Sequence, residues 1–128
     1  MSDDLDAVRR AAREAHDRGD FQAAIERLST VINILGPNSR AAVEDQVTLA
    51  RYLSAVADYD AALSVLSHAE RHLPVDAGLL VDKGIVLARL ERFEEAEAVL
   101  QSALAAGADD PDVLDALAQV SARLGKTR

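Results

Sequence analysis

The chain lacks cysteine and tryptophan and contains only three prolines and six glycines in 128 residues. Without cysteine it can form no disulfide framework, no thiol nucleophile and no cysteine-based zinc or iron–sulfur site. Aromatic residues make up 3% of the sequence, whereas alanine and leucine, which favour helices, are abundant. We therefore expect an all-α fold.

Basic residues are also few, because 14 Lys and Arg face 22 Asp and Glu and the formal net charge is −8. Nucleic-acid binding requires a basic footprint, so nucleic acid is not an expected partner. No run approaches the roughly 18 apolar residues of a membrane span, and residues 1–20 are too charged for a secretion signal. We expect a cytoplasmic protein with no membrane contact. Arginine outnumbers lysine by 12 to 2, which with the alanine content indicates a GC-rich bacterial source.

Three aromatic residues, Phe21, Tyr59 and Phe93, recur at spacings of 38 and 34 residues. After each aromatic, apolar residues follow at the spacing of one helix face: Ala24, Leu28 and Val31; Ala62, Leu66 and Ala69; Ala96, Leu100 and Ala103. Nine residues before each aromatic stands a small residue: Ala12, Ala50 or Gly84. Each repeat is therefore predicted to be two antiparallel helices joined by a tight turn.

Pro37, Pro74 and Pro111 mark the joints between repeats, because proline stops one helix or starts the next. We predict helix pairs at about 5–38, 43–76 and 77–110, and a lone helix at 111–124. The four extra residues 39–42 are predicted to add one turn to the third helix, capped by Asn38 or Ser39.

One helix pair cannot bury its apolar stripe alone, so stability must come from stacking of neighbouring pairs. The last helix then needs one apolar and one polar face. We expect the apolar face to contain Leu114, Leu117, Ala118 and Leu124, and the polar face to contain Asp112, Asp115, Gln119 and Arg123. The helix is predicted to be a solvating cap.

These features resemble a tetratricopeptide repeat (TPR) array over residues 5–124. The best matches are Leu49-Ala50-x2-Leu53, Ala62-x3-Leu66 and Pro74; Gln46, Lys83, Gly36 and Ala108 depart from the family pattern. The resemblance implies a single domain over residues 1–128, wound as a right-handed superhelix of three helix pairs and a C-terminal capping helix. It also implies a non-enzymatic adaptor that binds a protein or peptide along the concave face of its first helices.

The residues beside the buried stripes of the first helices are the candidate groove: Arg9, Arg13, Val47, Arg51, Val81, Ile85 and Arg89. Arginine presents a planar fork suited to carboxylates, and the aliphatic residues supply apolar contact. We expect an acidic, apolar partner segment; an ordinary solvated helix face is the alternative interpretation. The chaperone-binding clamp of one TPR subclass is not expected. Its positions correspond to Arg9, Arg13, Thr48, Gly78 and Asp82, and Asp82 would repel a carboxylate.

No glycine-rich phosphate loop is present, and no cofactor or catalytic site is expected. His68 and His72 lie four residues apart and could share a metal, but a stable site needs a third ligand. A solvated helix surface is the favoured interpretation of this pair, and a metal-binding protein is an alternative. Another alternative is a self-associating scaffold in which residues 1–6 occupy a neighbour's groove. We expect a monomer or a weak homo-oligomer.

Overall fold

The computed structural model describes residues 2–72 and 76–125, with side chains from Asp4 onward. Within these ranges every regular element is helical: seven α-helices and one short 3-10 helix. The predicted all-α fold is confirmed. The helices group into two compact units, Met1–His72 and Leu73–Arg128. No helix in the described ranges has the length and apolar character needed to cross a membrane.

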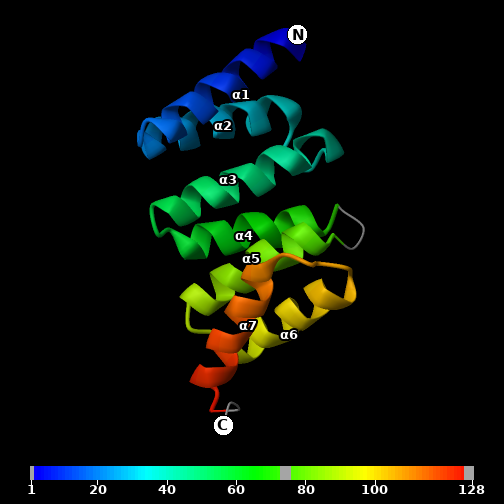
Figure 1. Ribbon diagram of the computed structural model, residues 1–128. Helices are drawn as coiled ribbons and strands as arrows, with labels where there is room; N and C mark the ends of the chain where they lie inside the picture. The colour runs from blue at the N-terminus through cyan, green and yellow to red at the C-terminus, as the bar shows by residue number, and fades with distance from the viewer. Residues whose placement is uncertain (1, 73–75, 126–128) are drawn as a thin grey trace. The chain divides into compact units, whose positions relative to one another are not determined.

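The first unit contains two helix pairs (Figure 1). Helix α1 (Ser2–Asp17) packs against α2 (Phe21–Leu35), and α3 (Val43–Ala55) packs against α4 (Tyr59–Glu70). Helix α2 also contacts α3, which joins the two pairs. Helix α1 begins at Ser2, whereas the repeat predicts a start near residue 5.

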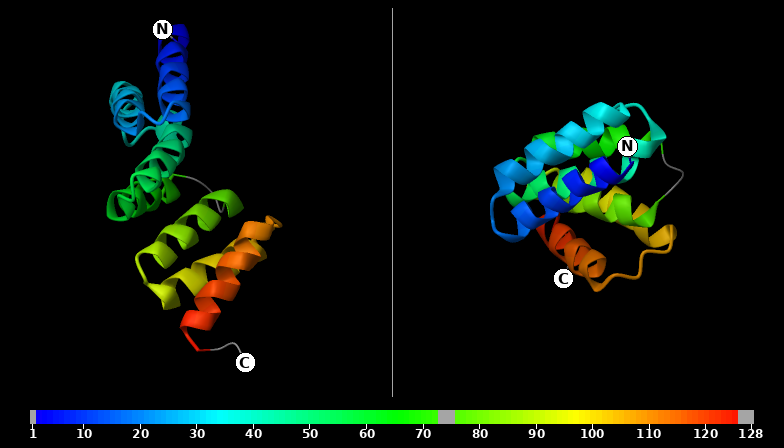
Figure 2. Two further views of the ribbon diagram at one scale, coloured as in Figure 1. Left: turned by 60° about the vertical axis from the view of Figure 1, so that its left-hand side comes forward. Right: turned by 90° about the horizontal axis from the view of Figure 1, so that it is seen from above.

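The second unit contains one helix pair and the lone C-terminal helix. Helix α5 (Ala77–Arg89) packs against α6 (Phe93–Ala105), and α7 (Pro111–Arg123) contacts both of them. The left view of Figure 2 shows α7 alongside α5 and running in the same direction. Helix α7 is therefore placed as the first helix of a further pair.

The core is built from the apolar positions that recur in each repeat. All nine residues of the predicted ladders on α2, α4 and α6 are buried, as are the small residues Ala12, Ala50 and Gly84 on the facing helices. Small residues allow the paired helices to approach closely, and leucines fill the space between them. The predicted register of the repeat is therefore correct.

The turns that follow the first helices share one backbone conformation. Residues at equivalent positions have φ between 61° and 82°: Gly19, Ala57, Glu91 and Gly125. This left-handed region favours glycine, so Ala57 and Glu91 adopt it at a cost in conformational energy. In the first two turns the next residue, Asp20 or Asp58, accepts a hydrogen bond from a backbone N–H of the helix that follows.

The four extra residues lie between α2 and α3. They form a 3-10 helix, η1 (Arg40–Ala42), that leads directly into α3. Ser39 is the N-cap residue of η1, one of the two predicted positions, but its side chain makes no capping hydrogen bond. The Pro37 carbonyl oxygen accepts a hydrogen bond from Gln46 Nε2 at 2.7 Å and lies 2.8 Å from His68 Nε2. Pro111 opens α7 as predicted, whereas Pro74 lies outside the described residues.

The predicted faces of α7 need correction. Val113 and Val120 are the buried residues of this helix, whereas Leu114 is 59% exposed and Ala118 is also exposed. A helix wheel shows that α7 carries apolar residues on two faces, and only the face with the two valines packs onto the unit. The polar residues expected on the outer face are exposed, namely Asp112, Asp115, Gln119 and Arg123, whereas the prediction that Leu114 and Ala118 belong to the packed face is wrong.

Candidate functional site

The second unit has an open groove of about 710 Å³ along α5 and α7. Its lining comes from the end of α5, the turn into α6 and one face of α7: Ile85, Ala88, Arg89, Glu91, Phe93, Asp112, Asp115, Ala116, Gln119, Val120, Ala122 and Arg123. The groove combines an apolar floor with charged side chains. Such a surface can bury apolar side chains of a ligand and fix its orientation through charge.

The charges along this groove are unevenly distributed. Arg89 lies in the last turn of α5 and Arg123 in the last turn of α7, so both lie at the C-terminal ends of their helices. Asp112 lies in the first turn of α7 and Asp115 one turn further on. The groove therefore has an arginine-bearing end and an acidic end.

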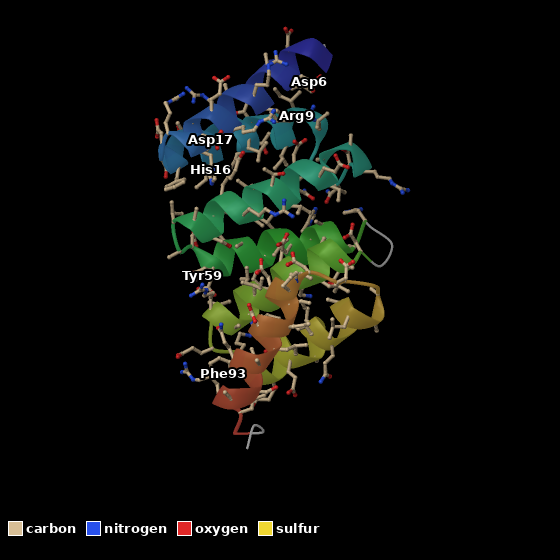
Figure 3. The ribbon with its side chains drawn as sticks, viewed as in Figure 1. Asp6, Arg9, His16, Asp17, Tyr59 and Phe93 are labelled. Carbon is tan, nitrogen blue, oxygen red and sulfur yellow. The ribbon has the colours of Figure 1, made fainter. Side chains whose placement is uncertain are left out.

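Arg123 is already engaged within the unit. Its Nη2 atom lies 3.2 Å from Glu91 Oε1, and its guanidinium carbon lies 4.9 Å from the centroid of the Phe93 ring (Phe93 is labelled in Figure 3). The ion pair and the cation–π contact hold this exposed guanidinium beside the Phe93 ring. Arg89 is exposed and has no ion pair within the described ranges, so its guanidinium group is available to a ligand.

The structure brings together two of the three groove residues predicted on α5. Ile85 and Arg89 both line the groove, with Ile85 half-buried in its wall. Val81 is buried in the helix packing and does not line the groove. The phenyl ring of Phe93 also lines the groove, although the sequence indicated only its role at the helix turn.

In the first unit, Arg9 is held by carboxylates of the protein itself. Its Nε and Nη2 atoms donate to the two carboxylate oxygens of Asp45 at 2.9 Å each, and Nη1 donates to Asp6 at 2.7 Å. Arg9 and Asp6 are labelled on α1 in Figure 3. The hydrogen bonds to Asp45 raise the pKa of Arg9 above its ordinary value. Arg9 ties α1 to α3.

The sequence pattern did not indicate the role of Asp45, which is 7% exposed. The repeat spacing nevertheless aligns Asp45 with apolar residues, because Asp45 stands 34 residues before Leu79 and 68 before Val113. Both of these residues are buried apolar side chains. A carboxylate at a position that is apolar in other repeats indicates a buried ion pair, since an unpaired buried charge is costly.

The remaining predicted residues of the first unit lie on α1 and α3. Arg13 and Arg51 are exposed and Val47 is half-buried. Arg13 lies close enough to Tyr52 to favour its ionised form, although burial raises the pKa of Tyr52 overall. Arg13 and Arg51 belong to the first unit and Arg89 to the second.

The ring of His16 connects three helices of the first unit. It stacks on Tyr52 of α3 with centroids 4.6 Å apart and meets the edge of Phe21 of α2 at 5.2 Å. Figure 3 labels His16 at the end of α1. Together with the Arg9–Asp45 pair, this stack fixes α1 against α3 at two points.

His68 of α4 and His72, in the turn that follows α4, lie near each other. The ring centroids of His68 and His72 lie 5.3 Å apart, and His68 Nε2 is at the Pro37 carbonyl oxygen. Over residues 2–72 and 76–125, no three His, Cys, Asp or Glu side chains gather where they could hold a metal ion. The pair offers two imidazole rings, and His68 Nε2 is already in contact with the Pro37 carbonyl oxygen.

A smaller cavity of about 300 Å³ lies among α2, α3 and α4. Its lining is mostly apolar and includes Ile32, Leu49 and Val65, with Gln46 and His68 beside them. Gln46 is buried, and its Oε1 atom has no hydrogen-bond partner in the part of the chain that the structure describes. The cavity lies at the joint that contains the four extra residues.

The family model for the tetratricopeptide repeat matches residues 53–120, which is more than half of the chain. The chain belongs to the tetratricopeptide repeat family. No curated protein sequence matches it.

Several solved structures match nearly the whole chain. The first TPR of Spaghetti (RPAP3), bound to the HSP90 peptide SRMEEVD, has a TM-score of 0.84 at 14% identity, covering 98% of this chain and 96% of that one. MamA has a TM-score of 0.85 at 20% identity, covering 98% of this chain and 67% of MamA. The Yersinia enterocolitica type III secretion chaperone SycD, in complex with a YopD peptide, has a TM-score of 0.81 at 18% identity, covering 97% of each chain. These similarities establish the TPR fold.

Proposed function

We propose that the chain is a non-enzymatic interaction module that binds a segment of a partner protein along its first helices. The observation that carries the proposal is the groove of about 710 Å³ along α5 and α7. Ile85, Phe93 and Val120 contribute apolar surface to it, and Arg89 contributes an exposed guanidinium. Such a combination suits a peptide that buries one or two apolar side chains and pairs one carboxylate.

The charges of the groove set the expected orientation of the partner. A carboxylate of the partner would lie beside Arg89, because Arg123 is engaged with Glu91 and Phe93. At the other end Asp112 and Asp115 would repel a second carboxylate. The partner segment is therefore acidic at one end and apolar over its centre.

The similar structures support a peptide-sized ligand. The RPAP3 domain is bound to an HSP90 peptide that contains two adjacent glutamates and a final aspartate, and SycD is in complex with a YopD peptide. These peptides belong to those proteins. They support the proposal because proteins of this fold bind a peptide of another protein.

In the first unit we assign the corresponding surface to Arg13, Val47 and Arg51. Arg13 and Arg51 are exposed, and Val47 is half-buried between polar neighbours. Arg9 is left out of this surface, because its guanidinium is already hydrogen-bonded to Asp6 and Asp45. A ligand that displaced Arg9 would leave the buried Asp45 carboxylate without its partner.

The test uses the full chain and three labelled peptides of equal length: acidic and apolar, basic and apolar, and purely polar. Fluorescence anisotropy should show binding of the acidic, apolar peptide near the micromolar range, about −8 kcal/mol. Binding should weaken as salt shortens the screening length below about 10 Å. Arg89→Glu should abolish binding, because a carboxylate would then face the acidic end of the peptide.

Arg92→Glu is the matched control. Arg92 lies three residues further along, is exposed and pairs with Glu95 outside the groove lining. This variant should bind as the unaltered chain does, and both variants should keep their helical circular dichroism. Equal binding by Arg89→Glu and Arg92→Glu would refute the groove assignment. Concentration-dependent light scattering without any peptide binding would favour the self-associating scaffold instead.

A further inference from the structure

The cavity of about 300 Å³ among α2, α3 and α4 has a buried hydrogen-bond acceptor in its wall. Gln46 lines the cavity and is only 4% exposed. Its Oε1 atom is shielded from water and has no hydrogen-bond partner among the residues that the structure describes. A buried acceptor without a partner is unfavourable, and an occupant of the cavity that supplies a donor would remove this penalty.

The orientation of the Gln46 amide is fixed by the Pro37 carbonyl group. A carbonyl oxygen can only accept, so the amide nitrogen of Gln46 must face it, and Nε2 lies 2.7 Å away. For the same reason His68 Nε2, at 2.8 Å from this oxygen, must carry a proton. Oε1 therefore cannot exchange places with Nε2, and it remains the atom that needs a donor.

The repeat register shows that position 46 is apolar in the other first helices. Val8, Leu80 and Leu114 stand at the equivalent positions, at spacings of 38, 34 and 68 residues from Gln46. The bond to Pro37 explains the amide nitrogen of Gln46 but not its oxygen. Helix packing and the joint therefore leave one polar atom of this cavity without a function.

The lining of the cavity determines the chemistry of its occupant. Ile32, Leu49 and Val65 make the walls apolar, and the imidazole of His68 offers a flat ring on which an aromatic ring can stack. An aliphatic side chain would fill the space but leave Oε1 unpaired. A phenol supplies a donor together with lone pairs that also need partners, whereas an indole N–H is a donor only. An indole ring therefore matches one acceptor in an apolar cavity.

Two exposed polar side chains on opposite helices favour an indole that is attached to a peptide. Asn33 of α2 and Ser64 of α4 both line the cavity and are exposed. Their amide and hydroxyl groups can bond to backbone groups on either side of an inserted side chain. A free indole molecule carries no such backbone groups.

We propose that this cavity binds a tryptophan side chain of a partner protein, whose indole N–H donates to Gln46 Oε1. The terminal torsion of glutamine is broad, so the amide can turn toward the occupant while Nε2 stays beside Pro37. The cavity belongs to the first unit and the α5–α7 groove to the second. The tryptophan site therefore does not depend on the groove proposal.

The probe is the pentapeptide Ser-Gly-Trp-Gly-Ser with blocked ends, added to the full chain. The chain contains no tryptophan, so indole emission comes from the peptide alone and should move to shorter wavelength when the chain is in excess. NMR shifts should change at the methyl groups of Ile32 and Val65 and at the side-chain amide of Gln46. A peptide with benzothienylalanine, in which sulfur replaces the indole N–H, should bind about tenfold more weakly.

Gln46→Leu should remove this tenfold preference, because the variant has no acceptor at the cavity wall. Leucine stands at the equivalent position 80, so the variant should fold, and thermal denaturation checks this. Gln22→Leu is the matched control, since Gln22 is exposed on α2 and does not line the cavity. It should keep the preference for tryptophan.

Arg89→Glu separates this site from the groove, because it should bind the tryptophan peptide as the unaltered chain does. Loss of binding in that variant, or shifts at Ile85 in place of Ile32, would overturn the tryptophan site. Equal affinity of the unaltered chain for the tryptophan and benzothienylalanine peptides would also overturn it. So would tighter binding of the matching tyrosine peptide, or binding of free indole as tight as that of the peptide.

Discussion

Gly84 of α5 and Leu100 of α6 approach each other more closely than any side chain at position 84 would permit. A β-carbon built on Gly84 would lie 2.5 Å from Leu100 Cδ2 and 2.6 Å from its Cγ. Leu100 is fully buried and cannot turn away without displacing its neighbours. The pair therefore sets the spacing of the two helices.

Gly84→Ala should destabilise the protein by about 1–3 kcal/mol, because the overpacking cost exceeds the gain in helix propensity. Denaturant unfolding followed by circular dichroism measures the change. Combining Gly84→Ala with Leu100→Val should cost less than the sum of the two single changes, since the shorter side chain relieves the clash. Strict additivity would show that the two residues do not determine the spacing.

Ala57→Gly should stabilise the protein by about 0.5–1 kcal/mol. Ala57 has φ of 61°, and relief of this left-handed strain exceeds the entropy that glycine loses on folding. The control Ala98→Gly, at an exposed position inside α6, should instead cost about 1 kcal/mol. A lower melting temperature for Ala57→Gly would argue against strain at this turn.

Arg9→Ala should destabilise the protein by about 1–3 kcal/mol, because it leaves the buried Asp45 carboxylate without its charged partner. The double variant Arg9→Ala with Asp45→Leu should recover much of the loss, since leucine is the residue at the equivalent position 79. Unfolding curves of the two variants measure this recovery. If the double variant is less stable than Arg9→Ala, the Asp45 carboxylate stabilises the fold through a contact other than the one with Arg9.

Tyr52 should make stability sensitive to alkaline pH. Burial raises its pKa above 10.0, so the folded state holds the phenol proton more tightly than the unfolded state does. This contribution is complete below pH 10.0 and is lost as the pH rises through the folded-state pKa. Between pH 10.0 and the folded-state pKa, the unfolding free energy of Tyr52→Phe should therefore fall less steeply than that of the unaltered chain. Parallel slopes for the two proteins would contradict burial as the cause.

Zinc should leave the thermal denaturation of the chain unchanged. His68 and His72 offer two imidazoles, and one nitrogen of His68 already contacts the Pro37 carbonyl oxygen. A metal bound only to the folded state would raise its melting temperature in a saturable way. Such a rise, lost in His68→Ala, would revive the metal site as a hypothesis.

Periodicity predicted the parts of the fold that every repeat shares. The ladder through Ala62 and Leu66 could be recognised because the same sizes recur at the same spacing, and size is what helix contact requires. The pair between Arg9 and Asp45 could not be recognised in that way. Its members lie 36 residues apart, and only the packing of α1 on the second pair brings them together.

The faces of α7 show a second limit. Val113 and Leu114 are adjacent and equally apolar, so the sequence does not distinguish which face packs. Helix α5, in contrast, has two faces covered, one by its partner helix α6 and one by α7. On α7 the partner position is open within the described residues, and Leu114 is consequently exposed.

The joint at Pro37 has a consequence for how this chain can vary in length. Gln46 of α3 and His68 of α4 both reach the same carbonyl oxygen, so the connection is held by two helices of the following pair. The four added residues coil into η1 beside this anchor and leave the register of Ala50 and Ala62 intact. Insertions between helix pairs are therefore tolerated. An insertion within a pair would move the small residues of one helix out of contact with the leucines of the other. Repeats from different TPR proteins should recombine with this chain at Pro37 more readily than at any turn inside a pair.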